Sequence, residues 1–444
     1  MTSPTQRPGG AVELLVFGFG TSVAMWFSGY LARLPGIEAP SPVLGGLLLF
    51  CLAAGGWVAG RQGSGGLRLG LRAGLVTAAL NLLVLGSLLA DGQAGGLSPS
   101  VALWLPGSFL ATAAIVGGGA AAGAASQPSQ RSLPSPPEAR DWPFWFAAVA
   151  AVATLLLLIV GGVVTSHKAG LAVVDWPNSF GSNMFLFPLS RMTGGVYYEH
   201  AHRLFGSLVG LTTVALAVVV YISDRREWLR RFSLLAVAAV IGQGILGGLR
   251  VTGRLTLSAD PAQTAPNLTL AVVHGVFGQV FFGMVVAVAV FLSATFRSGA
   301  EPVTRRSAGT DRSLSALFTI VLLVQLVLGA IQRHLAQGLL IHISLAVVVL
   351  GLAFACGSRA AGLYRDLPVL RNTGLLLSAA IALQVSLGIL AVVAIGVESG
   401  PAGPAAWQVA LRAAHQATGA VLLACAVSLA IWTRRLATPP PETS

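Results

Sequence analysis

The sequence predicts an all-α integral membrane protein with about twelve transmembrane helices. Of its 444 residues, 55% are hydrophobic and only 9% are charged, whereas a soluble globular domain carries roughly a quarter charged residues. Twelve mostly apolar stretches are each long enough to cross a hydrocarbon core of about 30 Å. Lipid offers no hydrogen-bond partners to backbone N–H and C=O groups, so these stretches are expected to be helices, which satisfy those groups internally. The expected spans are 11–33, 42–60, 71–90, 102–124, 143–165, 199–222, 229–250, 269–293, 313–333, 339–358, 370–396 and 406–433.

The net charge of +12 follows membrane topology and does not mark a nucleic-acid surface. With the N-terminus inside and the twelve spans alternating, the inside segments hold 19 of the 27 Lys and Arg residues. This is the positive-inside bias, so both termini are expected in the cytoplasm. The chain is therefore expected to be a multi-pass protein of the cell (plasma) inner membrane, with lipid and no nucleic acid as partner.

A polar linker divides the chain. Residues 126–142 are rich in Pro, Ser and charge, which is typical of a solvated cytoplasmic segment. Before the linker, residues 1–125 form a predicted four-helix membrane region of unknown role, without histidine. After it come the other eight spans.

Those eight spans contain an internal repeat. The pattern Gln-x-x-Leu-Gly begins at Gln243, at Gln325 and at Gln384. We therefore predict two tandem four-helix bundle units, 143–297 and 313–435. Because each unit has an even number of spans, both have the same orientation in the membrane.

Four histidines recur with this repeat. His202 and His274 are 72 residues apart, and His342 and His415 are 73 apart. Each lies in the first third of a helix that runs from outside to inside, so all four share one depth near the outer face. Two imidazoles on facing helices can supply both axial ligands of a heme iron. Packing histidines are the plainer alternative, but matched depth and spacing favour two heme sites.

The other histidines and the cysteines fit this prediction less well. His200 points away from His202, so it is expected at the membrane interface, and His167 and His334 are expected to be solvated. A zinc or copper site is less favoured because neither Cys nor carboxylate recurs with the repeat. The cysteines are expected to be small buried hydrophobes: Cys51, Cys356 and Cys425.

An asymmetry between the units indicates where chemistry occurs. Glu199 lies three residues before His202 and hence on the same helix face, whereas Leu339 holds the matching position before His342. Only the first unit also has a long outer segment, residues 166–198, that could act as a lid. Glu199 is thus the candidate acid/base group; its alternative role is a carboxylate that favours the helix dipole.

Arginines near the outer ends of these helices are candidate partners for heme propionates, since guanidinium matches carboxylate bidentately. Arg203 directly follows His202. The alternative is that each arginine is an interfacial anchor. The others are Arg250, Arg254, Arg333 and Arg412.

These residues together resemble the heme A synthase family. The resemblance covers about residues 143–434 and rests on Glu199-His200-Ala201-His202-Arg203-Leu204, the Gln-x-x-Leu-Gly helices, the three later histidines and the loop with Ala169-Gly170-Leu171 and Asp175-Trp176-Pro177.

The resemblance implies an eight-helix enzyme that oxidises a methyl group of heme O to the formyl group of heme A for cytochrome oxidase. It implies that His202 and His274 bind the substrate heme O and that Glu199 is needed for catalysis. It also implies that His342 and His415 bind a resident heme B that passes electrons. Partners would be a heme O synthase and an unidentified electron donor.

Two features depart from the family. Many members have a cysteine pair in the outer loop, whereas Asn178 and Ser179 follow Trp176-Pro177 here, and the loop has no cysteine. The four N-terminal helices are also additional, and they lack the paired aspartate motifs of a fused heme O synthase.

Two other functions stay open on the sequence. A membrane di-heme electron carrier needs neither Glu199 nor a lid. A heme transporter or chaperone would bind heme reversibly. A terminal oxidase is disfavoured because no extra histidines are present for a copper site.

Overall fold

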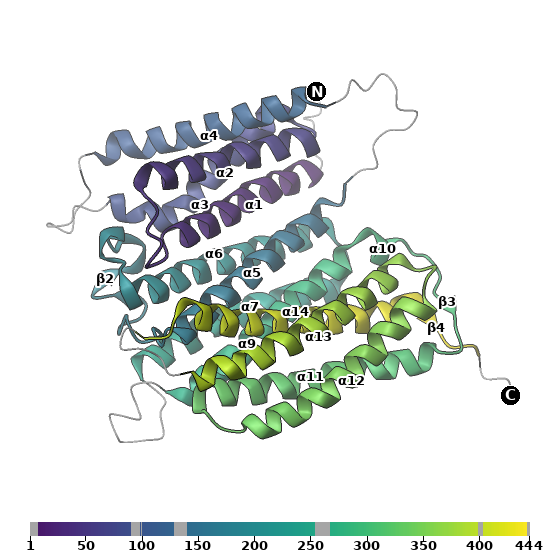
Figure 1. The fold of residues 1–444 in the computed structure, drawn as a ribbon. Helices are drawn as coiled ribbons and strands as arrows, with labels where there is room; N and C mark the ends of the chain where they lie inside the picture. The colour runs from purple at the N-terminus through teal and green to yellow at the C-terminus, as the bar shows by residue number, and fades with distance from the viewer. Residues whose placement is uncertain are drawn as a thin grey trace, which may run out of the picture. The chain divides into compact units, whose positions relative to one another are not determined.

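The computed structural model describes residues 8–89, 98, 100–127, 140–253, 267–397 and 403–441. Within these ranges, twelve helices are long and apolar enough to cross a membrane, which confirms the predicted all-α membrane fold. Most of the predicted linker, 128–139, and Arg254 lie outside the described residues. The helices, labelled in Figure 1, are α1 (Pro8–Ala32), α2 (Ser41–Gln62), α3 (Gly66–Leu85), α4 (Val101–Ala125), α5 (Trp142–Ser166), α6 (Gly194–Ser223), α7 (Glu227–Thr252), α9 (Leu268–Leu292), α11 (Ala308–Leu335), α12 (Leu339–Leu363), α13 (Pro368–Gly396) and α14 (Ala406–Leu436).

Short elements connect the long helices. They are η1 (Gly86–Leu89), β1 (Asn178–Ser179), β2 (Ser182–Asn183), η3 (Met184–Leu186), η4 (Leu189–Arg191), α10 (Ala294–Arg297), β3 (Val303–Thr304) and β4 (Ala437–Thr438). Strands β1 and β2 pair antiparallel, and β3 and β4 pair parallel.

The chain divides into two compact units. Unit 1 comprises residues 1–156 and 172–233, and unit 2 comprises residues 157–171 and 234–444. Helix α5 therefore contributes its first part to unit 1 and its last part to unit 2. The predicted repeat units, 143–297 and 313–435, stay predictions.

In unit 1, the N-terminal helices pack through glycines. Helix α4 lies against both α2 and α3, and at several contacts no side chain would fit. A Cβ added to Gly74 of α3 would stand 2.6 Å from the Cα of Ala113 on α4. Gly60 of α2 similarly faces the backbone carbonyl of Ala120. Close backbone approach through small residues is a common way for helices to associate in lipid.

Helix α1 also packs on α6, the helix that carries Glu199 and His202. The rings of Tyr30 and Tyr197 stack with centroids 5.6 Å apart, and the Tyr197 hydroxyl donates to the Tyr30 carbonyl at 2.6 Å. The Trp26 and Phe205 rings meet edge to face at 5.9 Å. All four side chains are buried. The N-terminal helices thus support the helix that holds the predicted catalytic residues.

In unit 2, four helices form a closed bundle. Contacts run from α11 to α12, from α12 to α13, from α13 to α14 and from α14 back to α11, with α9 packed on α11 and α14. Helices α12 and α14 are therefore diagonal neighbours in this bundle. Its core contains Phe318, Leu322, Leu370, Leu377 and Leu429, all at most 2% exposed.

Candidate functional site

Three of the four predicted histidines lie against a glycine of the preceding helix in unit 2. A Cβ added to Gly247 would stand 3.3 Å from Cε1 of His274. The same distance is 3.0 Å from Gly329 to His342, and 3.1 Å from Gly388 to His415. Each glycine is the last residue of a Gln-x-x-Leu-Gly pattern. The absent side chain leaves room for the imidazole ring.

The glutamine of each pattern lies beside the same histidine. Gln243 Nε2 donates to the His274 carbonyl at 3.1 Å, and Gln325 Nε2 donates to the His342 carbonyl at 3.0 Å. Gln384 Nε2 lies 3.4 Å from the ring Nε2 of His415. Glutamine and glycine are four residues apart, so both lie on one face of their helix. Each preceding helix thus contacts one histidine at two points.

His342 and His415 lie on the diagonal pair α12 and α14 of one bundle. Both side chains are partly buried, and the Nδ1 atom of each is buried without a hydrogen-bond partner among the described residues. A buried, unpaired ring nitrogen is costly unless something binds it. Two such imidazoles on diagonal helices therefore fit a ligand that is inserted between the helices, as a heme would be.

The other predicted pair lies in two different units. His202 is on α6 in unit 1, partly buried and one turn from Glu199, and His274 is on α9 in unit 2. That His202 and His274 bind one heme stays a prediction.

The predicted lid is an ordered loop in unit 1 over residues 172–193. Strands β1 and β2 form a hairpin whose two turn residues, Phe180 and Gly181, both have positive φ, at 51° and 78°. This conformation suits a two-residue hairpin turn. The Asp175 carboxylate accepts the N–H groups of both turn residues at 2.7 Å. Asp175 therefore fixes the hairpin turn through two backbone hydrogen bonds.

The pKa of Asp175 lies below its usual value. Burial acts to raise this pKa, but the hydrogen bonds from Gly181 and Phe180 lower it by more in sum. The positive charge of Arg203 lowers it further. The carboxylate form of Asp175 therefore stabilises the loop at neutral pH.

Arg203 fastens this loop to α6. Its Nη1 donates to the carbonyls of Asp175 and Asn178, at 2.7 Å and 2.9 Å. Its Nη2 donates to the Val173 carbonyl at 2.7 Å and to Oε1 of Glu199 at 2.8 Å. Because its charge is paired with the Glu199 carboxylate, Arg203 already has an anionic partner other than a propionate. Its predicted role in cofactor binding stays a prediction.

Glu199 is the central acceptor under the loop. The residue is 4% exposed; Oε1 accepts from Arg203, and Oε2 accepts the Val173 N–H at 3.0 Å. Both oxygens are thus hydrogen-bonded by donors of defined position, one from the same helix and one from the loop. Charge-assisted bonds of this kind fix the orientation of the carboxylate.

His200 is buried under the same loop. It is 1% exposed, its Nδ1 lies 3.1 Å from Oγ of Ser179, and its ring packs on Phe187 with centroids 4.9 Å apart. The ring is therefore enclosed by protein atoms, and its position at the membrane interface stays a prediction. Because His200 is two residues from His202, it faces the loop on a different side of α6.

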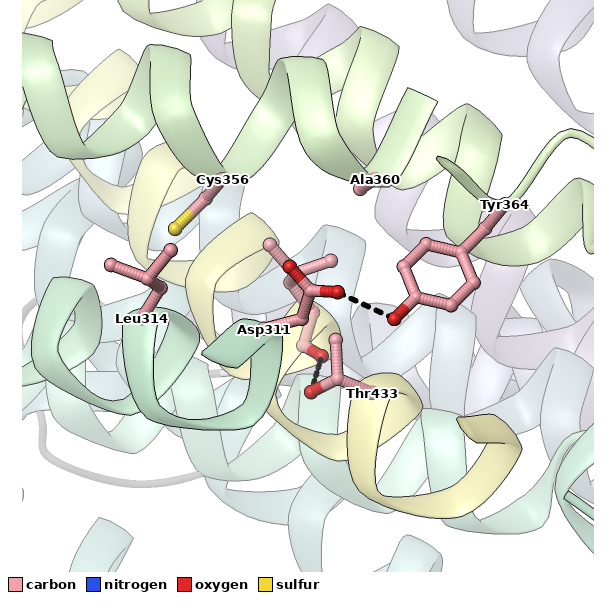
Figure 2. A pocket seen from close by; sticks show the side chains of 7 residues that line it. Asp311, Leu314, Cys356, Ala360, Tyr364 and Thr433 are labelled. Carbon is pink, nitrogen blue, oxygen red and sulfur yellow. Dashed lines mark hydrogen bonds between the residues drawn. The ribbon is translucent and has the colours of Figure 1, made fainter. Parts of the chain in front are cut away.

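A polar cluster lies far from the histidines, where α11 begins and α12 ends (Figure 2). Asp311 is 6% exposed and accepts from Arg359 Nε and from the Tyr364 hydroxyl, both at 2.6 Å. Burial, then its hydrogen bond to Asp311, raises the pKa of Tyr364 to about 12, so the phenol is a donor at neutral pH. The adjoining cavity of about 10 Å³ has room for about one water molecule. The cluster therefore has a structural role, connecting the start of α11 to the end of α12.

Two contributions to the candidate site could not be predicted from the sequence. The pattern Gln-x-x-Leu-Gly marks the repeat in the sequence. Its contact with the histidine of the following helix becomes visible only once it is known which helices pack together. The Val173 N–H, which binds Glu199, has no side-chain signal at all.

Part of the chain is similar to known proteins. Residues 144–342 match the COX15-CtaA family, described as a cytochrome oxidase assembly protein. A heme A synthase from Beijerinckia indica subsp. indica is 24% identical over 220 residues, covering 44% of this chain and 58% of that protein. A heme A synthase from Lysinibacillus sphaericus is 33% identical over 110 residues, covering 24% and 34%. The chain thus spans about three fifths and one third of these relatives' own lengths.

Proposed function

We propose that this chain oxidises the methyl group of heme O to the formyl group of heme A, because residues 144–342 match the COX15-CtaA family and two partly similar proteins are heme A synthases. The product would supply a cytochrome oxidase. Heme O is the proposed substrate, with a heme O synthase and an electron donor as proposed partners.

The observation that carries this proposal is the position of Glu199. It lies one turn from His202 on α6 and is held by Arg203 and the Val173 N–H beneath an ordered loop. An electron carrier requires no buried carboxylate beside its heme ligand. A site that transforms its substrate benefits from an oriented proton acceptor and a cover that excludes water.

The proposed division of labour follows the histidines. His202 and His274 would bind the substrate heme, and His342 and His415 would bind a resident heme B. The unpaired Nδ1 atoms and the diagonal placement of α12 and α14 support the second site. A heme bound there supplies one-electron redox chemistry.

The chain's own residues would bind, orient and exclude water. The glycine and glutamine of each preceding helix would position the histidines. Glu199 would take up a proton at Oε2, the oxygen that accepts from Val173. A carboxylic acid is a poorer acceptor than a carboxylate, so proton uptake there would weaken one tie between α6 and the loop.

The membrane placement follows from the charge distribution. We infer an inner-membrane protein with both termini in the cytoplasm, since 19 of its 27 Lys and Arg residues fall on one side of the alternating spans. His202, His274, His342 and His415 would then lie near the outer face.

Expression in a host that makes heme O but no heme A tests the activity. Extracted pigment should contain heme A, and Glu199→Gln should abolish it while bound heme stays visible in the spectrum. Glu227→Gln is the matched control, because Glu227 also pairs with an arginine four residues later but is 75% exposed. Bound heme without heme A in the wild type, with a suitable reductant present, would favour a di-heme electron carrier.

A further inference from the structure

We propose that Arg333 and Arg412 form a clamp for the two propionate groups of the heme held between His342 and His415. The inference rests on the proposed heme site in unit 2 and adds the residues that would bind the acidic edge of the porphyrin.

Position is the first argument. Arg333 lies four residues after Gly329, the glycine that contacts the His342 ring, and Arg412 lies three residues before His415. Residues three or four apart share a helix face. Helix α11 ends two residues after Arg333, and α14 begins six residues before Arg412. Both guanidinium groups therefore lie about one turn beyond an imidazole, towards the same end of the bundle.

Direct contact is the second argument. Arg333 Nη1 donates to the Arg412 carbonyl at 3.3 Å, so the two residues are neighbours across the contact between α11 and α14. Arg333 Nη2 donates to the Gly162 carbonyl at 2.7 Å and to Ser166 Oγ at 2.9 Å. Arg412 Nη2 donates to the Ala394 carbonyl at 2.9 Å. These neutral acceptors fix both side chains but leave their charges uncompensated.

Unused donors are the third argument. The Nε atoms of Arg333 and Arg412 are buried and have no hydrogen-bond partner among the described residues. Across the same part of the chain, neither arginine forms an ion pair with a carboxylate. Arg203 differs, since it already binds Glu199 and three loop carbonyls. Arg333 and Arg412 are therefore the better acid-binding pair.

The charge pattern selects the ligand. Two adjacent cations in a partly buried site attract a group with two negative charges. Guanidinium binds carboxylate through paired, charge-assisted hydrogen bonds. A heme carries two propionates on one edge of its ring, and the proposed iron ligands lie one turn away. The residues present thus fit both the iron and the acidic edge of one cofactor.

Binding of hemin and of hemin dimethyl ester, whose propionates are blocked, tests the clamp. The full chain would carry His202→Ala and His274→Ala, so that only the second site is measured after expression without heme. This protein should bind hemin roughly tenfold or more tightly than the ester, the ratio expected for charged hydrogen bonds. Arg333→Gln and Arg412→Gln should each reduce hemin affinity towards that of the ester, without weakening ester binding.

A second readout is the reduction midpoint of the bound heme. Removal of either positive charge should move this midpoint to a lower potential, because the ferric state with its extra positive charge becomes relatively easier to hold. Arg305→Gln is the matched control, since Arg305 forms an exposed pair with Asp366 in the same unit. It should change neither the affinities nor the midpoint.

The clamp is overturned if the parent protein binds hemin and its ester equally. It is also overturned if the Arg333 and Arg412 variants lose affinity for both ligands alike, as a merely structural role would predict. Hemin binding that survives His342→Ala and His415→Ala would overturn the heme site itself, and the clamp with it. Production of heme A in cells reports separately on the proposed activity.

Discussion

Gly388 lies against the ring of His415, with Cε1 only 3.1 Å from where a Cβ on this glycine would stand. The position of the His415 ring thus depends on the absence of a side chain on a residue 27 positions earlier. Gly329 and His342 show the same relationship at 3.0 Å. The positions of these two imidazoles in unit 2 therefore depend on how closely the backbone of the neighbouring helix approaches.

Substitution Gly388→Ala should weaken heme binding in unit 2. The added methyl group must displace the imidazole by a few tenths of an ångström, and overpacking of this kind costs about 1–3 kcal/mol. A roughly tenfold to hundredfold loss of heme affinity would follow. The measurement is heme per protein from reduced-minus-oxidised spectra of the purified chain.

Gly351→Ala serves as the control for that experiment. Gly351 is also within a long helix of unit 2, but a Cβ there would meet nothing within 4 Å. Alanine favours helix by about 1 kcal/mol over glycine, so this variant should keep its heme. Equal heme content in both variants would contradict the role assigned to Gly388.

Acidification should loosen the loop through Asp175. The folded-state pKa of this carboxyl is below its ordinary value, so its stabilisation is complete above the unfolded-state pKa, near 4. The stabilisation is lost as the pH falls through that region towards the lower folded-state pKa. Limited proteolysis of the loop between pH 6 and pH 3 should show increasing cleavage, after correction for the pH response of the protease.

Asp175→Asn removes the titrating group from the loop. The variant should be cleaved faster at pH 6, because Phe180 and Gly181 lose a charged acceptor. Its remaining pH dependence should be flatter. An asparagine variant with the same pH profile as the wild type would place the acid sensitivity elsewhere.

The contact between α1 and α6 should contribute measurably to the stability of unit 1. Tyr197→Phe removes the hydroxyl that donates to the Tyr30 carbonyl, at a cost of about 1 kcal/mol. Tyr197→Ala also removes the stacked ring and should cost about 3–5 kcal/mol. Thermal unfolding in detergent measures both, with Tyr221→Phe, 63% exposed on the same helix, as the control. Equal melting of all variants would refute this support role.

Asp311→Asn should destabilise unit 2 without changing its heme spectrum. The change removes the charged acceptor of Arg359 and Tyr364, which costs about 1.5–3 kcal/mol. Asp311 precedes Gln325 by 14 residues on α11, or about 21 Å along the helix, so the histidines should not respond. Asp366→Asn, in an exposed ion pair, should leave melting nearly unchanged. A shifted heme spectrum in Asp311→Asn would show coupling between the two ends.

The helices were predictable because each apolar run is long enough to span a membrane. Within lipid, a helix satisfies all the backbone hydrogen bonds of such a run. The proximity of Glu199 to His202 also followed from helix geometry alone, since they are three residues apart. By contrast, the Val173 N–H reaches Glu199 through the path of a 26-residue connection, which no periodic pattern encodes. The burial of His200 depends on that same loop path.

The role of the three glycines was only partly predictable from the sequence. Their spacing from glutamine was visible in the sequence, but a missing side chain reveals its purpose only when the neighbouring helix is placed. The division of α5 between two compact units has no counterpart in composition or periodicity, because it arises from contacts between distant segments.

The glutamine and glycine contacts have a consequence for how the protein is assembled. Gln325 binds the His342 carbonyl, Gln384 lies beside the His415 ring, and Gly329 and Gly388 leave room for the two rings. Protein atoms therefore position both histidines without iron. Such a chain can complete its membrane insertion before it binds a porphyrin.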